Sequence, residues 1–167
     1  MANSHLPCRR SIRLRGYDYS RSGAYFVTIV TQDRCALFGR IINDVMIPTD
    51  AGRMVQEVWD AIPQHYAGVD IDEFVVMPDH VHGIVLLTPQ PGRRLTLPDV
   101  VHRFKTMTTK RYVDGVRTSG WPGFPIRLWH RNYYERIVRD EMAFQRIRAY
   151  IVANPSRWKK KREAHTG

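Results

Sequence analysis

The chain has 167 residues, of which 43% are hydrophobic and 25% charged, and its formal net charge is +10. That length suits one domain with its own core and hardly two. No apolar run approaches the roughly 20 residues that a membrane helix needs, the first residues lack the apolar core of a signal peptide, and two cysteines are too few for a disulfide framework. We therefore expect one domain over residues 1–167, in the cytoplasm and without membrane contact.

The excess positive charge lies at the two ends of the chain. Residues 1–40 hold seven arginines and two aspartates, residues 131–167 hold ten basic and four acidic residues, and the middle is close to neutral. Such segments suit a polyanion, because each neutralised phosphate releases condensed counterions. Solvated tails that aid solubility are the alternative, and an anionic membrane surface is a weaker third. We expect a basic arm over about 1–22 and a basic tail over about 156–167.

The first part of the chain contains strand patterns and one helix pattern. GAYFVTIVTQ (23–32) is rich in β-branched and aromatic residues and predicts a strand. Two short apolar pieces flank Asn43 and Asp44 and predict a hairpin. Residues 49–66 place apolar side chains at helical spacing and predict a helix.

The second part of the chain repeats this alternation. The predicted elements are strands over 69–78, 80–88 and 126–139 and helices over 99–116 and 140–154. Pro78 and Asp79 mark a turn between the first two strands, and Pro155 ends the last helix. The order of elements predicts an α+β domain in which helices cover one face of a mostly antiparallel sheet.

Two histidines stand one residue apart in MPDHVHGI (77–84), within otherwise apolar strands. Residues two apart on a strand point to the same side of the sheet, so His80 and His82 present both rings together. Two neutral imidazoles on one rigid face can ligate a divalent cation. The alternative is that each ring only satisfies its own hydrogen bonds. Other metal sites with paired histidines need a following aspartate, a third histidine at residue 84 or a far longer chain, and none of them fits.

Tyr150 and Asn154 are four residues apart on the last predicted helix and therefore share one face. Asn154 offers an amide oxygen as a metal ligand, and a phenol near a divalent cation is a plausible nucleophile toward phosphorus. Taken alone, the helix also allows Tyr150 as an ordinary residue at the edge of the core and Asn154 as a residue that ends the helix before Pro155.

Together these motifs resemble the HUH single-tyrosine transposases, in particular the REP-associated tyrosine transposase branch. The His-hydrophobe-His motif matches His80-Val81-His82, and the Tyr-x-x-x-Asn motif matches Tyr150 and Asn154. The flanking LWHRNYYERIVRDE and RLRGYDYSRSGAYFVTIVTQDR are similar to segments of that family, so the resemblance extends from about residue 9 to about residue 162.

The resemblance implies a ferredoxin-like or RRM-like fold and a metal-dependent endonuclease and strand transferase acting on single-stranded DNA, often beside a hairpin in repeat DNA. Tyr150 would attack the scissile phosphate and form a 5′-phosphotyrosine bond, which a 3′-hydroxyl later attacks. His80, His82 and Asn154 would hold Mg²⁺ or Mn²⁺. Asn154 stands where the insertion-sequence branch has glutamine. A homodimer is possible in the family, and no organic cofactor is expected.

Other residues compete for or extend these roles. Tyr133 and Tyr134 lie in a predicted strand, so one should face each side and one can line the site as a core or DNA-stacking residue. Asp79 can orient a histidine, although a turn role is favoured; His65, His102 and His130 are interpreted as structural or phosphate-contacting. The DNA-contact candidates are Arg9, Arg10, Arg13, Arg15, Arg131, Lys159, Lys160, Lys161 and Arg162. A helix face with Arg103, Lys105, Lys110 and Arg111 either extends that path or is only solvated.

Two other functions remain open at this stage. A domesticated DNA-binding protein of the same fold would bind DNA hairpins without cutting them, and a phosphohydrolase would use activated water instead of Tyr150. The set of His80, His82, Tyr150 and Asn154 favours the cutting enzyme, because a protein that only binds DNA has no chemical need for it.

Overall fold

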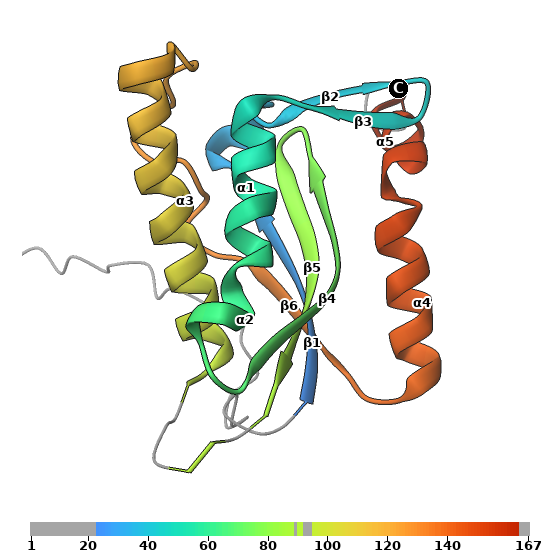
Figure 1. Cartoon of the computed structure of the whole chain (residues 1–167). Helices are drawn as coiled ribbons and strands as arrows, with labels where there is room; N and C mark the ends of the chain where they lie inside the picture. The colour runs from blue at the N-terminus through green and yellow to red at the C-terminus, as the bar shows by residue number, and fades with distance from the viewer. Residues whose placement is uncertain (1–22, 89, 92–94, 164–167) are drawn as a thin grey trace, which may run out of the picture.

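The computed structural model describes residues 23–88, 90, 91 and 95–163, except for the side chains of 159–163. Its main sheet has four strands in the order β4-β5-β1-β6, and every neighbouring pair is antiparallel (Figure 1). The main strands are β1 (Gly23–Val30), β4 (Val69–Met77), β5 (His80–Leu87) and β6 (Tyr134–Val138). The helices are η1 (Gln32–Arg34), α1 (Asp50–Asp60), α2 (Ile62–His65), α3 (Leu97–Ser119), α4 (Glu141–Val152) and α5 (Asn154–Glu163).

One face of the sheet is covered by α1 and α3, which lie side by side (Figure 1). Alternate residues of β1 and β5 point to this side, and Val27, Ile29, Val81 and Val85 are fully buried there. Trp59 of α1 packs against the sheet on this side. The α+β class with an antiparallel sheet is confirmed, and this face carries most of the core.

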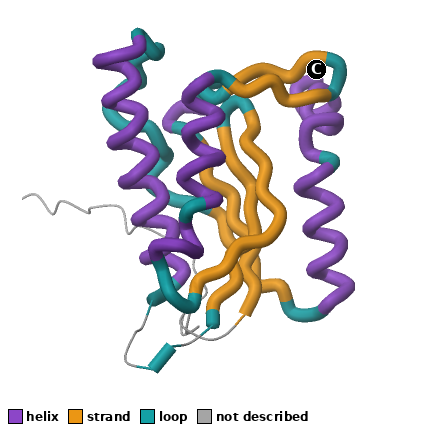
Figure 2. The backbone as a smooth tube through the Cα atoms, viewed as in Figure 1, coloured by secondary structure: helices purple, strands orange, loops and turns teal. Residues whose placement is uncertain are grey.

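The other face of the sheet carries α4, which continues into α5, so helices stand on both sides of the strands; Figure 2 shows this arrangement. Phe26 and Ile84 from the strands pack against Ile147 and Ile151 from α4. The prediction that helices cover one face of the sheet is confirmed for α1 and α3, and α4 lies in addition on the opposite face. Because this second cluster is small, much of the sheet surface around α4 stays available for polar side chains.

A small hairpin stands at one end of the sheet. It consists of β2 (Gly39–Ile42) and β3 (Val45–Pro48), joined by Asn43 and Asp44. Both turn residues have positive φ, at 47° and 63°, as a two-residue turn of the favoured hairpin type requires. The predicted hairpin is confirmed.

No helix among the described residues is long and apolar enough to cross a membrane.

Two predicted boundaries are wrong. The strand predicted over 126–139 begins only at Tyr134, because Leu128 and Trp129 turn into the core and only Trp129 makes an isolated bridge, to Thr31. The last helix does not end at Pro155. A short break at Ala153 separates α4 from α5, and Pro155 lies in the first turn of α5, where its missing N–H costs nothing.

Candidate functional site

The paired histidines lie at the start of β5 and face α4. Val81 between them points to the opposite side and is fully buried, while His80 and His82 are 7% and 5% exposed. Across the sheet, His82 is paired with Thr28 of β1, and His80 with Val30. The strand prediction therefore placed both imidazoles correctly on one face.

Each histidine ring is held through its Nδ1 atom. His80 Nδ1 is 2.5 Å from Asp79 Oδ1, and His82 Nδ1 is 2.7 Å from Thr28 Oγ1. Asp79 is itself buried at 6% exposure, and its backbone oxygen accepts hydrogen bonds from both the amide and the hydroxyl of Thr31. Asp79 thus occupies the predicted turn and also orients a histidine, the role that was less favoured from sequence.

These contacts bring the two Nε2 atoms to 3.1 Å from each other. An ionised Asp79 only accepts hydrogen bonds, so His80 carries its proton on Nδ1 and presents a lone pair at Nε2. His82 has two choices, because the Thr28 hydroxyl can either donate or accept. With its proton on Nε2, His82 donates to His80; with its proton on Nδ1, it presents a second lone pair toward the same point.

The face of α4 and α5 that meets the histidines carries three residues at helical spacing. The ring of Tyr150 is 5.4 Å from that of His82 between centroids, and Trp158 stacks on His80 at 5.5 Å. Asn154 lies between them in sequence, four residues from each, and is 6% exposed. Asn154 begins α5, and Trp158 lies four residues further along the same helix, so these two side chains share a helix face.

Tyr150 is enclosed by side chains from three elements. Phe26 of β1 contacts its ring edge-on at 6.0 Å and also stacks on His82 at 5.4 Å. Arg157 of α5 places its guanidinium carbon 5.9 Å from the centre of the Tyr150 ring. A positive group at this distance interacts favourably with the ring.

A groove of about 450 Å³ opens beside Tyr150, between α4 and the edge strand β6. Its lining is Phe26, Thr28, His82, Tyr134, Arg136, Ala143, Arg146, Ile147 and Tyr150. The predicted nucleophile and one predicted ligand thus face the same solvent-accessible space, which is large enough for a drug-sized ligand.

Comparison with known proteins identifies the family. A family model described as transposase, IS200 like, matches residues 22–154, which include both histidines, Tyr150 and Asn154. The chain belongs to this family.

Two proteins from Haemophilus influenzae are similar to the chain in sequence. A Haemophilus influenzae protein of unassigned function is 38% identical over 93% of each chain. A second protein from Haemophilus influenzae, provisionally named a REP-associated tyrosine transposase, is 25% identical over 83% of this chain and 73% of its own.

Two solved structures share the fold of the transposase. A REP-associated tyrosine transposase bound to a REP hairpin has a TM-score of 0.62 at 19% identity, over 87% of this chain and 73% of its own. A protein from Deinococcus radiodurans, described provisionally as a transposase, has a TM-score of 0.51 at 22% identity, over 83% and 94%.

The competing tyrosines of this transposase divide as predicted. Tyr133 is 9% exposed and belongs to the core on the α3 side, whereas Tyr134 is 55% exposed and lines the groove with Tyr150. His130 is exposed before β6, and its Nδ1 accepts from the Asn132 amide at 3.3 Å.

The predicted DNA-contact residues are only partly described. Arg9, Arg10, Arg13 and Arg15 lie outside the described residues. Lys159, Lys160, Lys161 and Arg162 belong to α5, but their side chains are not described. Arg131 is exposed before β6, and its backbone oxygen accepts from Lys105 Nζ at 3.2 Å.

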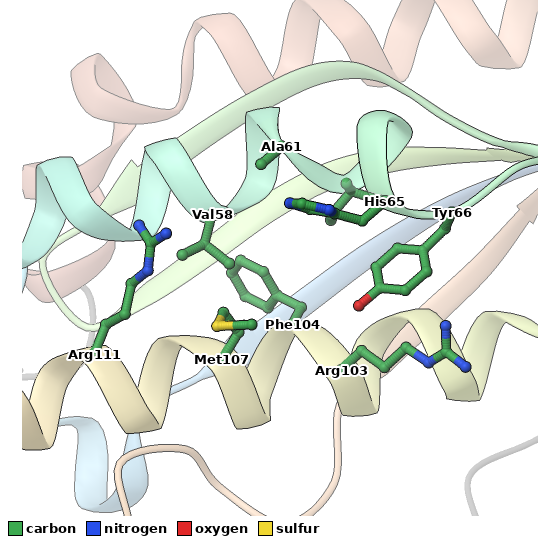
Figure 3. A pocket seen from close by; sticks show the side chains of 9 residues that line it. Val58, Ala61, His65, Tyr66, Arg103, Phe104, Met107 and Arg111 are labelled. Atoms are coloured by element: carbon green, nitrogen blue, oxygen red, sulfur yellow. The ribbon is translucent and has the colours of Figure 1, made fainter.

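The basic residues of α3 lie on the sheet face opposite the histidines. There Arg103 and Arg111 border a pocket of about 50 Å³ between α1, α2 and α3, together with His65 (Figure 3). Arg103 lies 4.6 Å from the centre of the Tyr66 ring, and Arg111 pairs with Glu57 at 3.6 Å. This helix face therefore does not continue the groove beside Tyr150.

Sequence analysis missed three residues near the histidines. Thr28, Arg136 and Arg146 were not singled out, yet all three line the groove. Thr28 and Arg136 become visible only through strand register, since the first pairs with His82 and the second with Phe26. No local sequence signal marks them.

Proposed function

We propose that this transposase is a metal-dependent single-stranded DNA endonuclease and strand transferase that uses Tyr150 as its nucleophile. The observation that carries the proposal is the contact of Tyr150 with His82, 5.4 Å between ring centroids, within one chain and on the open groove. A phenol beside paired imidazoles suits phosphoryl transfer through a covalent intermediate. The geometry supports a site completed within one chain, although a homodimer stays compatible with it.

His80 and His82 fit a cation site. Two ligands at right angles, each about 2.1 Å from an ion, are about 3.0 Å apart, and the two Nε2 atoms are separated by 3.1 Å. Metal-bound histidines usually donate their other ring N–H to an oxygen, as the contacts to Asp79 and Thr28 allow. We propose Mg²⁺ or Mn²⁺ as the ion.

The remaining ligands would come from an amide and from the substrate. Among the described residues, no cluster of three or more His, Cys, Asp or Glu side chains has metal-binding geometry. Asn154, buried at the start of α5 between Tyr150 and Trp158 in sequence, is the proposed third protein ligand, and a DNA phosphate oxygen would complete the site. When bound, the cation polarises the scissile phosphate and offsets the charge that develops on it.

The two reaction steps assigned to Tyr150 conserve the number of phosphate ester bonds, so they need no external energy source. Its phenolic oxygen attacks the phosphorus and gives up its proton to solvent in the groove. The bond from phosphorus to the 3′ oxygen breaks, and that oxygen takes up a proton to leave a free 3′-hydroxyl. A 3′-hydroxyl then attacks the phosphotyrosine bond, which restores the Tyr150 phenol and rejoins the DNA.

We propose hairpin-containing repeat DNA as the substrate. The support is the similarity to a protein named a REP-associated tyrosine transposase and to a structure of such a transposase bound to a REP hairpin. The net charge of +10 suits this polyanion.

The test is formation of a covalent adduct between the protein and a single-stranded hairpin oligonucleotide in the presence of Mn²⁺. The wild-type chain should give a shifted band on a denaturing gel, and Tyr150→Phe should give none. Tyr134→Phe is the matched control, because that phenol lines the same groove, and it should keep the adduct.

Two outcomes would contradict the proposal. An adduct that persists in Tyr150→Phe would assign the nucleophile elsewhere. Cutting without any adduct, unaffected by Tyr150→Phe but abolished by His80→Ala, would indicate hydrolysis by water instead.

A further inference from the structure

We propose that the groove between β6 and α4 binds an unpaired nucleotide next to the attacked phosphate, with Tyr134 stacking on its base and Arg136 and Arg146 holding its phosphates. This inference rests on the proposed activity on single-stranded DNA. It adds the path that the bound DNA strand takes away from the histidine pair. It assigns binding roles to three residues outside the nucleophile and metal set.

Strand register places Tyr134 in line with the histidines. His82 of β5 pairs with Thr28 of β1, and Thr28 pairs with Tyr134 of β6. Paired residues of antiparallel strands point to the same face, so the three side chains form one row across the sheet. Neighbouring strands are about 4.8 Å apart, which puts Tyr134 about 10 Å from His82. When one phosphate of the strand lies at the histidine pair, the adjoining nucleotide is long enough to bring its base to Tyr134.

Tyr134 has the exposure and the support that a stacking platform needs. Its side chain is 55% exposed, and β6 is the edge strand of the described sheet. Phe26 supports it through an edge-on contact, with 6.5 Å between centroids and an interplanar angle of 70°. Stacking on an aromatic ring accepts every base and requires that base to be unpaired. The groove is therefore suited to a single strand and not to a duplex stem.

The charge of the groove matches the backbone of that strand. Arg136 projects from β6 and Arg146 from α4, so each wall contributes one exposed guanidinium. Among the described residues that line the groove, none has an acidic side chain. Arg136 pairs in register with Phe26, one row from Tyr134 on the same face. An aromatic ring and two arginines in one groove combine stacking with phosphate neutralisation, as in other proteins that bind single strands.

The experiment measures binding without cutting. A Tyr150→Phe parent, with a chelator present, is titrated into a fluorescently labelled single strand that carries 2-aminopurine beside the cleavage position. Tyr134→Ala should weaken binding about tenfold, since the loss of one stacked base is of that order, and should relieve quenching of the 2-aminopurine. Tyr134→Phe should retain both signals because it keeps the ring.

The arginines are tested through the salt dependence of binding. Arg136→Gln and Arg146→Gln should each lower the slope of log affinity against log salt by about 0.7, the value for one phosphate contact on a single strand. Arg117→Gln is the charge-matched control, because Arg117 is exposed on α3 at the other face of the sheet, and it should leave the slope unchanged.

The outcomes separate this inference from the proposed function. If the parent binds the single strand but Tyr134→Ala binds equally well and quenches equally, the groove assignment is overturned and the nucleophile assignment stands. If the parent binds no single strand at all, the proposed function fails together with the inference. Affinity for a duplex of the same sequence should be unchanged by Tyr134→Ala, and an equal loss there would also overturn the groove assignment.

Discussion

Arg148 of α4 and Asp72 of β4 form an ion pair that ties the helix of Tyr150 to the sheet, with Nε and Oδ1 2.9 Å apart. Arg148 Nη2 also donates to Glu73 at 3.3 Å. The register of β4 against β5 shifts between Ile71 and Phe74, so both acidic residues lie in the irregular part of the strand. Such an irregularity re-aims side chains, and here two neighbouring carboxylates meet one guanidinium.

Replacing Arg148 should disturb the position of α4 more than the overall fold. We expect Arg148→Met to lower the free energy of unfolding by about 1 kcal/mol, because the arginine is partly exposed and such pairs contribute little. The rate of adduct formation at saturating DNA should fall severalfold while DNA affinity is unchanged, and Arg148→Lys should recover part of that rate. Arg53→Met, which removes an exposed pair with Asp50, is the control. Equal adduct rates in Arg148→Met and wild type would contradict the positioning role.

The contacts that orient the histidines should set the affinity for the cation. We expect Asp79→Asn and Thr28→Val each to weaken Mn²⁺ binding about 10- to 100-fold, the usual effect of removing the hydrogen-bond partner of a metal-bound histidine. Free Mn²⁺ is measured by electron paramagnetic resonance without DNA. Asp44→Asn removes an exposed carboxylate from the hairpin turn and should leave the affinity unchanged. Wild-type affinity in both Asp79→Asn and Thr28→Val would argue against the site.

The start of α3 gives a prediction about pH. The Thr96 side chain and then its backbone N–H donate to the Asp99 carboxylate and hold its pKa below the ordinary value of 3.8. Because the pKa is lower in the folded state, this stabilisation is present above about pH 4 and is lost as the pH falls through the folded pKa. Asp99→Asn should therefore be less stable than wild type at neutral pH, and urea unfolding should show the difference shrinking toward pH 3. A difference that is constant with pH would contradict it; Asp114→Asn, in the same helix, is the charge-matched control.

Much of the site could be predicted because strand and helix periodicity fix which side chains share a face. The spacing of two put His80 and His82 together, as β5 confirms, whereas the spacing of four between Tyr150 and Asn154 crosses the break at Ala153. The packing of α4 over β5 is a long-range relationship that no local pattern contains, so it came only from the resemblance to a family. Thr28 was missed for the same reason, since its contact with His82 depends on the register between β1 and β5.

The wrong boundaries have local physical causes. Trp129 has a strand-forming side chain, but it is buried in the core and donates its ring N–H to Thr108 at 2.8 Å, which holds the segment away from regular pairing. Ile126 has a φ of 44°, which no strand residue adopts. Pro155 predicts a helix end, yet the same residue is equally suited to begin α5. Composition therefore allows a strand or an irregular segment at residues 126–133, and the position of Pro155 allows a helix end or a helix start. Tertiary packing decides between the alternatives in each case.

Gly83 follows the histidine pair directly, and a side chain there should destabilise the strand that carries it. An added Cβ would stand 2.5 Å from Trp59 Cζ2 and 2.8 Å from Phe74 Cδ2, and these two rings stack on each other at 4.3 Å between centroids. Neither ring can move without disturbing the core, so Gly83→Ala should lower the free energy of unfolding by about 1–3 kcal/mol. Gly123→Ala, where nothing lies within 4 Å, should change it by less than about 0.5 kcal/mol. The free energy of unfolding of both variants is measured by chemical denaturation. Equal stabilities of Gly83→Ala and Gly123→Ala would show that β5 accommodates a side chain at Gly83. His80 and His82 on the same strand would then be held less rigidly than the packing of Trp59 indicates.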